Sequence, residues 1–186
     1  MRRHMERTAT MILFGLLVAC TPSSAPPAAP APSPETSATA ASDKDPTAAD
    51  VAALNTRFDP ARDPAADLAV AQADARRTGR RIVLDVGGEW CSWCHLLDAF
   101  IEGDSEIRTL RDEGFVWMKV NYSEDNENAA FLSQFPAIKG YPHLFVLDAD
   151  GKLLHSQFTG ELEADKGQPK GYNRERFLGF LQAWAP

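Results

Sequence analysis

Residues 81–100 read RIVLDVGGEWCSWCHLLDAF, and this stretch decides the fold of the chain. It opens with an apolar run at residues 82–84 that is typical of a β-strand and is followed by one acid, Asp85. Two glycines then precede a Cys-x-x-Cys sequence from Cys91 to Cys94, after which apolar residues recur at helical spacing. The order predicts a strand, a tight turn, a cysteine pair and a helix.

The predicted start of the helix gives the two cysteines different chemical properties. Cys91 stands at the helix N-terminus, where free N–H groups and the helix dipole favour a thiolate over a thiol. Cys94 lies one turn further in, close enough to form a disulfide with Cys91 and shielded from solvent. We therefore interpret the pair as a redox-active dithiol in which Cys91 reacts first.

The Cys-x-x-Cys sequence also allows three other interpretations. A structural disulfide would stabilise the protein weakly, because so short a loop restricts the unfolded chain little. A zinc half-site needs two more ligands, and the sequence has no second Cys-x-x-Cys and no His-x-x-x-His. His95 completes a c-type haem attachment sequence, and haem would take its second axial ligand from Met118, His143 or His155. Because haem would also need a large apolar pocket in place of a buried strand, we favour the dithiol.

Several residues around the cysteines carry a resemblance to a known family. Asp85 stands six residues before the first cysteine, and Glu89 and Trp90 directly precede that cysteine. Lys119 lies on the next predicted strand, and Pro142 ends a Gly-x-Pro sequence before another strand. In this set of spaced motifs the chain resembles the thioredoxin superfamily, and chance agreement at so many positions is improbable.

The resemblance covers residues 58–186 and implies both a fold and an activity. The implied fold is of the α/β class, a thioredoxin-like arrangement of three layers, α/β/α, around a central mixed β-sheet. Within the superfamily the chain is most similar to the C-terminal periplasmic domain of DsbD-type thiol reductases, because a longer helix and turn with residues 104–107 follow the cysteines. The implied activity is the exchange of thiols for disulfides.

Helix caps, turn residues and apolar periodicity place the individual elements. Helices are predicted at residues 64–77, 91–101, 106–112 and 126–135, and strands at residues 81–86, 115–122, 144–147 and 152–158. A polar loop at residues 161–172 leads to a last helix that Asn173 caps. The apolar face of that helix is predicted to consist of Phe177, Phe180, Leu181 and Trp184.

The resemblance also implies roles for residues outside the Cys-x-x-Cys sequence. Asp85 would be buried, which raises the pKa of a carboxyl group, and would take the proton of Cys94. Lys119 would lie beside Asp85, although a surface position on its strand is the alternative. Pro142 would follow a cis peptide bond, lie against the sulfur of Cys91 and leave neighbouring backbone free for a substrate strand.

Aromatic residues are expected to form the surface on which a substrate docks. Trp90 and Trp93 would form apolar walls beside the cysteines, and Tyr141 would lie next to Pro142. Many family members have a small or β-branched residue before this proline and a threonine after it. Because this chain has Tyr141 and His143 there, its substrate preference is not carried over from the family.

Three charged or ionisable side chains are candidates for tuning the reactivity of the dithiol. His95 would stabilise the Cys91 thiolate when it is protonated, or would be a solvated residue of the first helical turn. Glu89 and Lys119 are the other two candidates, because each stands where the family carries a charged residue near its cysteines.

The residues before the predicted domain carry signals of export. Residues 1–19 are predicted to be a signal peptide, with a basic start and an apolar run too short to span a bilayer permanently. The run ends in Leu-Val-Ala-Cys at Cys20, which resembles the lipobox of bacterial lipoproteins, in which the cysteine is lipidated. Residues 20–57 are predicted to be a disordered tether, because a segment rich in Ala, Pro and Ser buries too little apolar surface to fold.

These features lead us to expect a lipid-anchored monomer of the cell envelope that faces the periplasm. The outer membrane is favoured because Thr21 is not the aspartate that retains many such lipoproteins at the inner membrane. The expected partners are disulfide-bearing protein substrates, a membrane thiol reductase as electron donor, and the membrane itself. A net charge of −7 argues against nucleic acid as a partner. No cofactor and no metal are expected.

A function of a different class remains open at this point. The chain would then be a non-catalytic module that docks clients or holds a metal such as copper(I), with an incidental dithiol. The direction of exchange is also open, since the reduction potential depends on how strongly the reduced state stabilises its thiolate.

Overall fold

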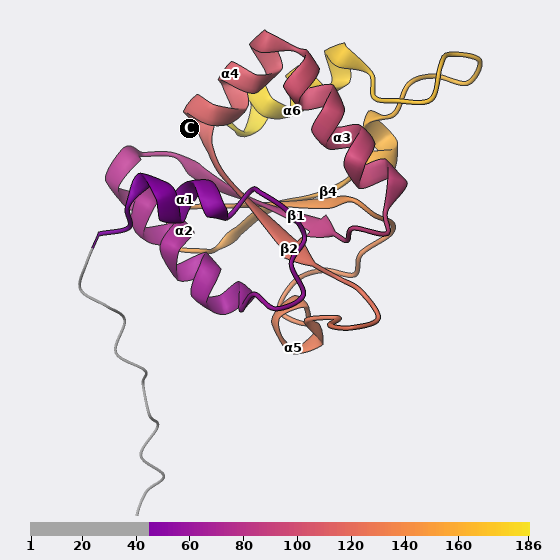
Figure 1. Cartoon of the computed structure of the whole chain (residues 1–186). Helices are drawn as coiled ribbons and strands as arrows, with labels where there is room; N and C mark the ends of the chain where they lie inside the picture. The colour runs from indigo at the N-terminus through magenta and orange to yellow at the C-terminus, as the bar shows by residue number, and fades with distance from the viewer. Residues whose placement is uncertain (1–44) are drawn as a thin grey trace, which may run out of the picture. The chain divides into compact units, whose positions relative to one another are not determined.

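The structure is a computed structural model that describes residues 45–186 (Figure 1). The predicted signal peptide (residues 1–19), Cys20 and residues 21–44 of the predicted tether lie outside the described residues. Within the described part of the chain, no helix is long and apolar enough to cross a membrane.

One four-stranded sheet forms the centre of the domain. Its strands are β1 (Arg81–Gly87), β2 (Phe115–Asn121), β3 (His143–Leu147) and β4 (Leu153–Phe158), in the spatial order β2-β1-β3-β4. β1 runs parallel to β2 and antiparallel to β3, and β3 runs antiparallel to β4. The sheet is therefore mixed, as the α/β fold with a thioredoxin-like layout requires.

Helices cover both faces of this sheet. The helices are α1 (Ala48–Ala53), α2 (Pro64–Thr78), α3 (Ser92–Gly103), α4 (Ser105–Gly114), α5 (Ala129–Leu132) and α6 (Arg174–Trp184), with a short 3₁₀ helix, η1 (Thr159–Leu162). α3, α4 and α6 lie together on one side of the sheet, and α1 and α2 lie on the other (Figure 1). The predicted three-layer α/β/α fold is confirmed.

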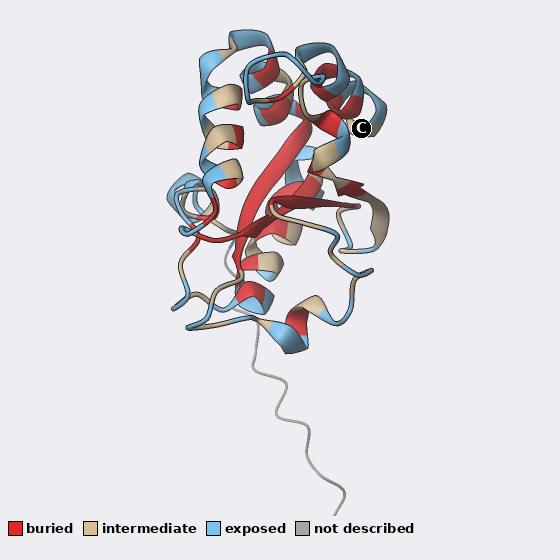
Figure 2. Ribbon diagram, turned by 90° about the vertical axis from the view of Figure 1, so that its right-hand side faces the viewer, coloured by how far each residue is buried: buried red, intermediate tan, exposed pale blue. Residues whose placement is uncertain are grey.

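The alternation of side chains along β1 decides which residues face which layer. Val83 packs into the core with α3 and α6, whereas Leu84 packs into the core with α2. Because successive side chains of a strand point to opposite faces, Asp85 and Gly87 lie on the same face as Val83, below α3. Figure 2 shows the buried strands running between the two helical layers.

The helix caps follow the predicted pattern. The carboxylate of Asp63 accepts a hydrogen bond from the backbone of Ala65 at 2.9 Å, and Pro64 occupies the first turn of α2. Gly79 ends α2 in the left-handed conformation, with φ of 76°. The amide oxygen of Asn173 accepts a hydrogen bond from Arg176 N at 3.1 Å and caps α6.

The predicted tether extends too far, because its last residues are folded. Thr47 and Asp50 form a reciprocal capping box at the start of α1. Leu54 is 1% exposed in the core, and its carbonyl oxygen accepts a hydrogen bond at 2.8 Å from the backbone of Lys119 on the edge strand β2. The boundary at residue 57 is therefore wrong, because α1 and Leu54 already belong to the folded domain.

The helix predicted at residues 126–135 is also shorter than expected, since α5 spans only Ala129–Leu132. Asn128 adopts a left-handed conformation with φ of 48°, and the side chain of Asn126 accepts a hydrogen bond from Asn128 N at 2.9 Å. Asparagine side chains that bond to nearby backbone compete with helix formation, which explains the loop before α5.

Candidate active site

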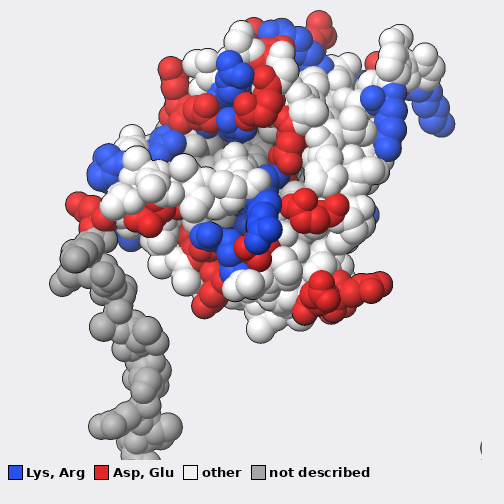
Figure 3. Space-filling model, viewed as in Figure 1, with Lys and Arg blue, Asp and Glu red and all other residues white. Residues whose placement is uncertain are grey.

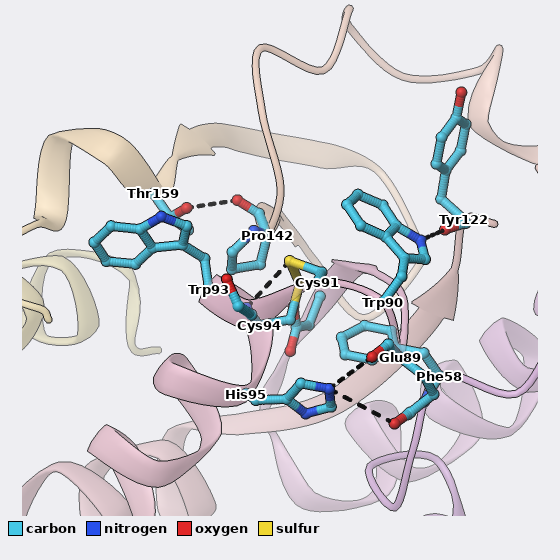
Figure 4. The surroundings of a disulfide bond; sticks show 12 residues. Phe58, Glu89, Trp90, Cys91, Trp93, Cys94, His95, Tyr122, Pro142 and Thr159 are labelled. Atoms are coloured by element: carbon cyan, nitrogen blue, oxygen red, sulfur yellow. Dashed lines mark hydrogen bonds and ion pairs between the residues drawn. A yellow bond between two sulfur atoms is a disulfide. The ribbon is translucent and has the colours of Figure 1, made fainter. Parts of the chain in front are cut away.

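Cys91 is the N-cap residue of α3, as the strand-turn-helix pattern predicts. The two cysteines form a disulfide with their Cα atoms 5.3 Å apart. Cys91 Sγ also accepts a hydrogen bond from the backbone N of Cys94 at 3.2 Å (Figure 4). The first sulfur therefore lies where backbone N–H groups and the helix dipole favour negative charge.

The second sulfur lies against the strand that precedes the helix. Cys94 is 1% exposed and Cys91 is 4% exposed, so Cys91 is the more accessible of the two. A Cβ atom at Gly87 would lie 2.5 Å from Cys94 Sγ and 3.2 Å from the ring of Phe58. Glycine at this position therefore allows Cys94 to pack directly on β1.

Asp85 is a buried carboxyl group on the same face of β1 as Gly87. Its Oδ2 accepts hydrogen bonds from Trp117 Nε1 at 3.2 Å and Lys119 Nζ at 3.4 Å. Its Oδ1 is buried and has no hydrogen-bond partner among the described residues. Burial raises the pKa of Asp85, and the positive charge of Lys119 partly opposes that rise.

Lys119 joins Asp85 to a carboxylate that reaches the surface. Its Nζ lies 2.7 Å from Oδ1 of Asp98, whose side chain is 40% exposed. Burial disfavours the charged ammonium, but Asp85 and Asp98 outweigh this effect and raise the pKa of Lys119. The predicted contact between Lys119 and Asp85 is thus present. Asp98 was not identified from the sequence, although it stands one helical turn after Cys94.

Phe58 is a second residue that sequence reasoning did not assign to the site. Its ring packs with Cys91 and Cys94, and the Lys119 ammonium lies 4.2 Å from the centre of the ring. The backbone N of Phe58 donates a hydrogen bond to Oε1 of Glu89 at 2.8 Å. Glu89 therefore fixes the segment before α2 against the cysteine pair.

His95 points back toward the turn before the cysteines. Its Nε2 lies 2.8 Å from the carbonyl oxygen of Glu89 and 3.9 Å from the Glu89 carboxylate (Figure 4). The side chain is half exposed. His95 is thus held near the start of α3 by the turn itself.

Pro142 follows a cis peptide bond, as the resemblance implies. Tyr141, on the other side of that bond, packs against the cluster of Phe58 and the two cysteines, and Figure 4 draws Pro142 beside the disulfide. The carbonyl oxygen of Pro142 accepts a 2.5 Å hydrogen bond from the hydroxyl of Thr159. This buried bond fixes the loop that faces the cysteines.

Trp90 and Tyr141 form one aromatic wall of the site. Trp90 is 58% exposed, and its Nε1 donates a hydrogen bond to the carbonyl oxygen of Tyr122 at 2.7 Å. The rings of Trp90 and Tyr141 meet edge to face at 5.5 Å, and Tyr141 stacks on Tyr122 at 4.8 Å. An exposed tryptophan held rigidly in this way offers apolar area to a partner at low entropic cost.

Trp93 forms the opposite wall with residues of the loop before α6. Its ring meets that of Tyr172 edge to face at 5.6 Å, and the Tyr172 hydroxyl donates a hydrogen bond to the carbonyl oxygen of Trp93 at 3.3 Å. The ammonium group of Lys170 lies 4.7 Å from the centre of the Trp93 ring. Neither Tyr172 nor Lys170 was identified from the sequence, where both belong to a polar loop.

The geometry does not favour haem attachment. The two cysteines are bonded to each other, and the Nε2 of His95 is engaged by the Glu89 carbonyl oxygen. Met118 is buried in the core on the far face of the sheet. His143 is also buried, with its Nε2 2.9 Å from Ser156 Oγ, and burial lowers its pKa to about 4.

Comparison with known proteins identifies relatives of this fold. A family profile described as thioredoxin-like matches residues 63–149. A disulphide isomerase from Xylella fastidiosa Temecula1 superposes with a TM-score of 0.57 at 23% identity, over 70% of this chain and 97% of that chain. The oxidised DsbD C-terminal domain of Neisseria meningitidis superposes with a TM-score of 0.51 at 20% identity, over 69% of this chain and 99% of that chain.

The reduced form of the same Neisseria meningitidis domain is also similar. It has a TM-score of 0.50 and 20% identity, over 66% of this chain and 96% of that chain. A search of curated proteins found no match. Because the identities to these solved structures lie below 25%, the likenesses establish the fold and not the chemistry of the site.

Proposed function

Since the chain belongs to the thioredoxin superfamily, we propose that it is a thiol-disulfide oxidoreductase that reduces disulfide bonds in proteins through Cys91 and Cys94. The observation that carries the proposal is the disulfide at the N-cap of α3, with buried Asp85 below the helix and Pro142 in the facing loop. A purely structural disulfide would need neither the acid nor the cis proline.

The first step uses the reduced protein. The thiolate of Cys91 attacks one sulfur of the client disulfide, the client S–S bond breaks, and one client thiolate leaves. A mixed disulfide then joins the client to Cys91. The N–H groups at the start of α3 stabilise the attacking thiolate, and the Cys94 backbone N already donates to this sulfur in the disulfide form.

The second step releases the client. Asp85 in its carboxylate form takes the proton of the Cys94 thiol, and the resulting thiolate attacks Cys91 Sγ. The mixed disulfide breaks, the second client thiolate leaves, and the Cys91–Cys94 disulfide forms. Two electrons pass in total from the dithiol to the client. Burial raises the pKa of this carboxyl group, and a higher pKa makes its carboxylate form a stronger base toward the Cys94 thiol.

Return to the reduced state needs an external source of two electrons. We propose a membrane thiol reductase as this donor, acting on the disulfide by the same exchange in reverse. The sequence of residues 1–20 supports a cell-envelope location with a lipid on Cys20 and the protein facing the periplasm, and Thr21 favours the outer membrane. An oxidising compartment is where clients with disulfides occur.

A turnover assay tests the proposal against the binding-module alternative. Insulin and a dithiol donor are incubated with the wild-type protein or with Cys91→Ser, and reduced insulin chains are counted per molecule of protein. Many reduction events per wild-type molecule, and none above background for Cys91→Ser, are expected. Stoichiometric binding of insulin or of copper(I) without turnover would favour the non-catalytic module instead.

A further inference from the structure

We propose that the loop between η1 and α6 forms a docking site for an acidic segment of the client, in which Lys170 binds a carboxylate close to the client's disulfide. The site is a groove between this loop and the outer side of α3, and we call it the Lys170 groove. The inference rests on the proposed function, because it concerns how a client is held while Cys91 attacks it.

Lys170 is placed beside the reactive end of α3. Its ammonium lies 4.7 Å from the centre of the Trp93 ring and 3.5 Å from the hydroxyl of Ser92, the residue that follows Cys91. The ion pairs formed between residues 45 and 186 do not include Lys170. An exposed cation with an aromatic neighbour and no carboxylate partner is free to bind an acidic ligand.

The loop that carries Lys170 is held at its base by backbone bonds. Ala164 N donates to the carbonyl oxygen of Gly171 at 2.9 Å, and Glu163 and Tyr172 form an isolated antiparallel bridge. Arg176 of α6 donates to the carbonyl oxygen of Glu163 at 2.7 Å. Because these bonds hold the base of the loop next to Lys170, binding of a client there costs less conformational entropy than binding to an untethered loop.

The groove itself is a cavity of about 700 Å³ that runs from this loop along α3. Leu96 and Phe100 of α3 and Tyr172 and Pro169 of the loop supply apolar surface, and Lys170 supplies the cation. In Figure 1 the loop projects beyond α3 at the upper right, and Figure 3 shows its basic side chains beside largely uncharged surface.

The charges in the groove select the kind of client. The acidic residue that lines it, Asp165, is already paired with Arg176 at 2.5 Å, so it does not neutralise Lys170. The protein as a whole carries a net charge of −7, so an acidic segment is attracted only locally, at the cation beside the Trp93 ring. The favoured occupant is an extended segment of a disulfide-bearing protein, with a carboxylate at Lys170 and an apolar side chain over Leu96 and Phe100.

The test uses two disulfide-containing peptides that differ only by Glu or Gln near the reactive cysteine. Their kcat/KM values are measured with the full-length wild-type protein, with Lys170→Gln, and with Lys166→Gln as a matched control on the same loop. The wild type should prefer the Glu peptide by about two- to fivefold, the range expected of one exposed ion pair. The preference should shrink at high salt, disappear in Lys170→Gln and persist in Lys166→Gln.

Three results would overturn the proposal. One is equal use of both peptides by the wild type. Another is a uniform loss of rate in Lys170→Gln with the preference retained, because Lys170 would then act on the Cys91 thiolate. The third is an equal loss of preference in both lysine variants, which would indicate a diffuse effect of loop charge.

A binding measurement separates failure of the docking site from failure of the proposed function. The same two peptides, with their cysteines replaced by serine, are titrated while tryptophan fluorescence is followed. Tighter binding of the Glu peptide that depends on Lys170 would support the groove even if no disulfide is turned over. Equal binding of the two peptides by the wild type would refute the groove even if turnover is fast.

Discussion

Lys119 Nζ lies 3.4 Å from Asp85 Oδ2 at a position where β1 and β2 are in register, and it lies 2.7 Å from Asp98 Oδ1. Two buried ionisable groups thus stand below α3, and the second of them reaches an acid at the surface. Burial raises the pKa of Asp85, and the positive charge of Lys119 opposes that rise by favouring the carboxylate form. The carboxylate is the form that accepts the proton of Cys94 in the proposed release step.

Replacement of Asp85 by Asn should slow the release of client from the mixed disulfide by about 10²-fold, because an amide cannot accept the proton of Cys94. The pKa of Asp85 is raised, so the active carboxylate form of the wild type should increase as pH rises through that pKa. The Asn variant should lose this part of the pH dependence. Single-turnover kinetics from pH 5 to about 9 checks both points.

The step before release provides the control for this variant. Formation of the mixed disulfide should be little affected by Asp85→Asn, and it can be followed alone in a Cys94→Ser background. An unchanged rate of release in Asp85→Asn would show that Asp85 has only a structural role.

Gly87→Ala should destabilise the protein by about 1–3 kcal/mol, the usual cost of adding a methyl group to a packed site. The new Cβ would lie 2.5 Å from Cys94 Sγ and 3.2 Å from the ring of Phe58, and β1 is buried on both sides. Urea unfolding measures the change. Gly103→Ala is the matched control, because nothing lies within 4 Å of its Cβ position, and it should cost less than about 0.5 kcal/mol.

His143 should make the protein less stable in acid. Its pKa is lowered to about 4 in the folded state by burial, by Lys139 and by His155, whereas the ordinary value is 6.5. The unfolded chain therefore binds the proton more tightly, and stability present above pH 6.5 is lost as pH falls toward about 4. The loss from this one group should reach up to about 3 kcal/mol.

The variant His143→Gln tests this assignment. Its free energy of unfolding, measured by denaturant at several pH values, should fall less between pH 6.5 and about 4 than that of the wild type. An identical fall in both proteins would mean that other groups cause the acid sensitivity.

The proposed lipid anchor is tested by detergent partitioning of cells that express the wild type or Cys20→Ala. Several acyl chains on Cys20 give stable membrane binding, where one chain gives only marginal binding. The wild type should enter the detergent phase, and Cys20→Ala should remain in the aqueous phase. A wild-type protein that stays aqueous and begins at a residue other than Cys20 would show that it is not a lipoprotein.

The sequence predicted the site best where the reactive residues and the helix that positions them are neighbours in the chain. The strand, the turn and the Cys-x-x-Cys sequence are contiguous, so Cys91 could be placed at a helix start from local patterns alone. Asp85 and Lys119 meet because they occupy the same register position on neighbouring parallel strands. The cis bond before Pro142 was accessible only through the family resemblance, since an isolated proline does not specify its isomer.

The residues that were missed depend on contacts between distant segments. Phe58 reaches the cysteines because Glu89 accepts a hydrogen bond from its backbone. These two residues are 31 positions apart in the sequence, and local sequence patterns do not predict contacts over such a separation. Lys170 meets Ser92 across 78 residues for a similar reason. The docked helix before residue 57 was missed because it has only six residues, and its alanines resemble a continuation of the Ala-, Pro- and Ser-rich segment before it.

The most direct test of the account is to trap the mixed disulfide and to identify the cysteine that carries the client. Cys94→Ser and Cys91→Ser are incubated with a disulfide-bearing client, quenched with acid and mapped by peptide mass spectrometry. The account predicts that Cys94→Ser accumulates client bound through Cys91, because the attacking thiolate remains and the resolving thiol is gone. Client bound through Cys94 in Cys91→Ser at an equal or greater yield, or no client bound in either variant, would contradict it.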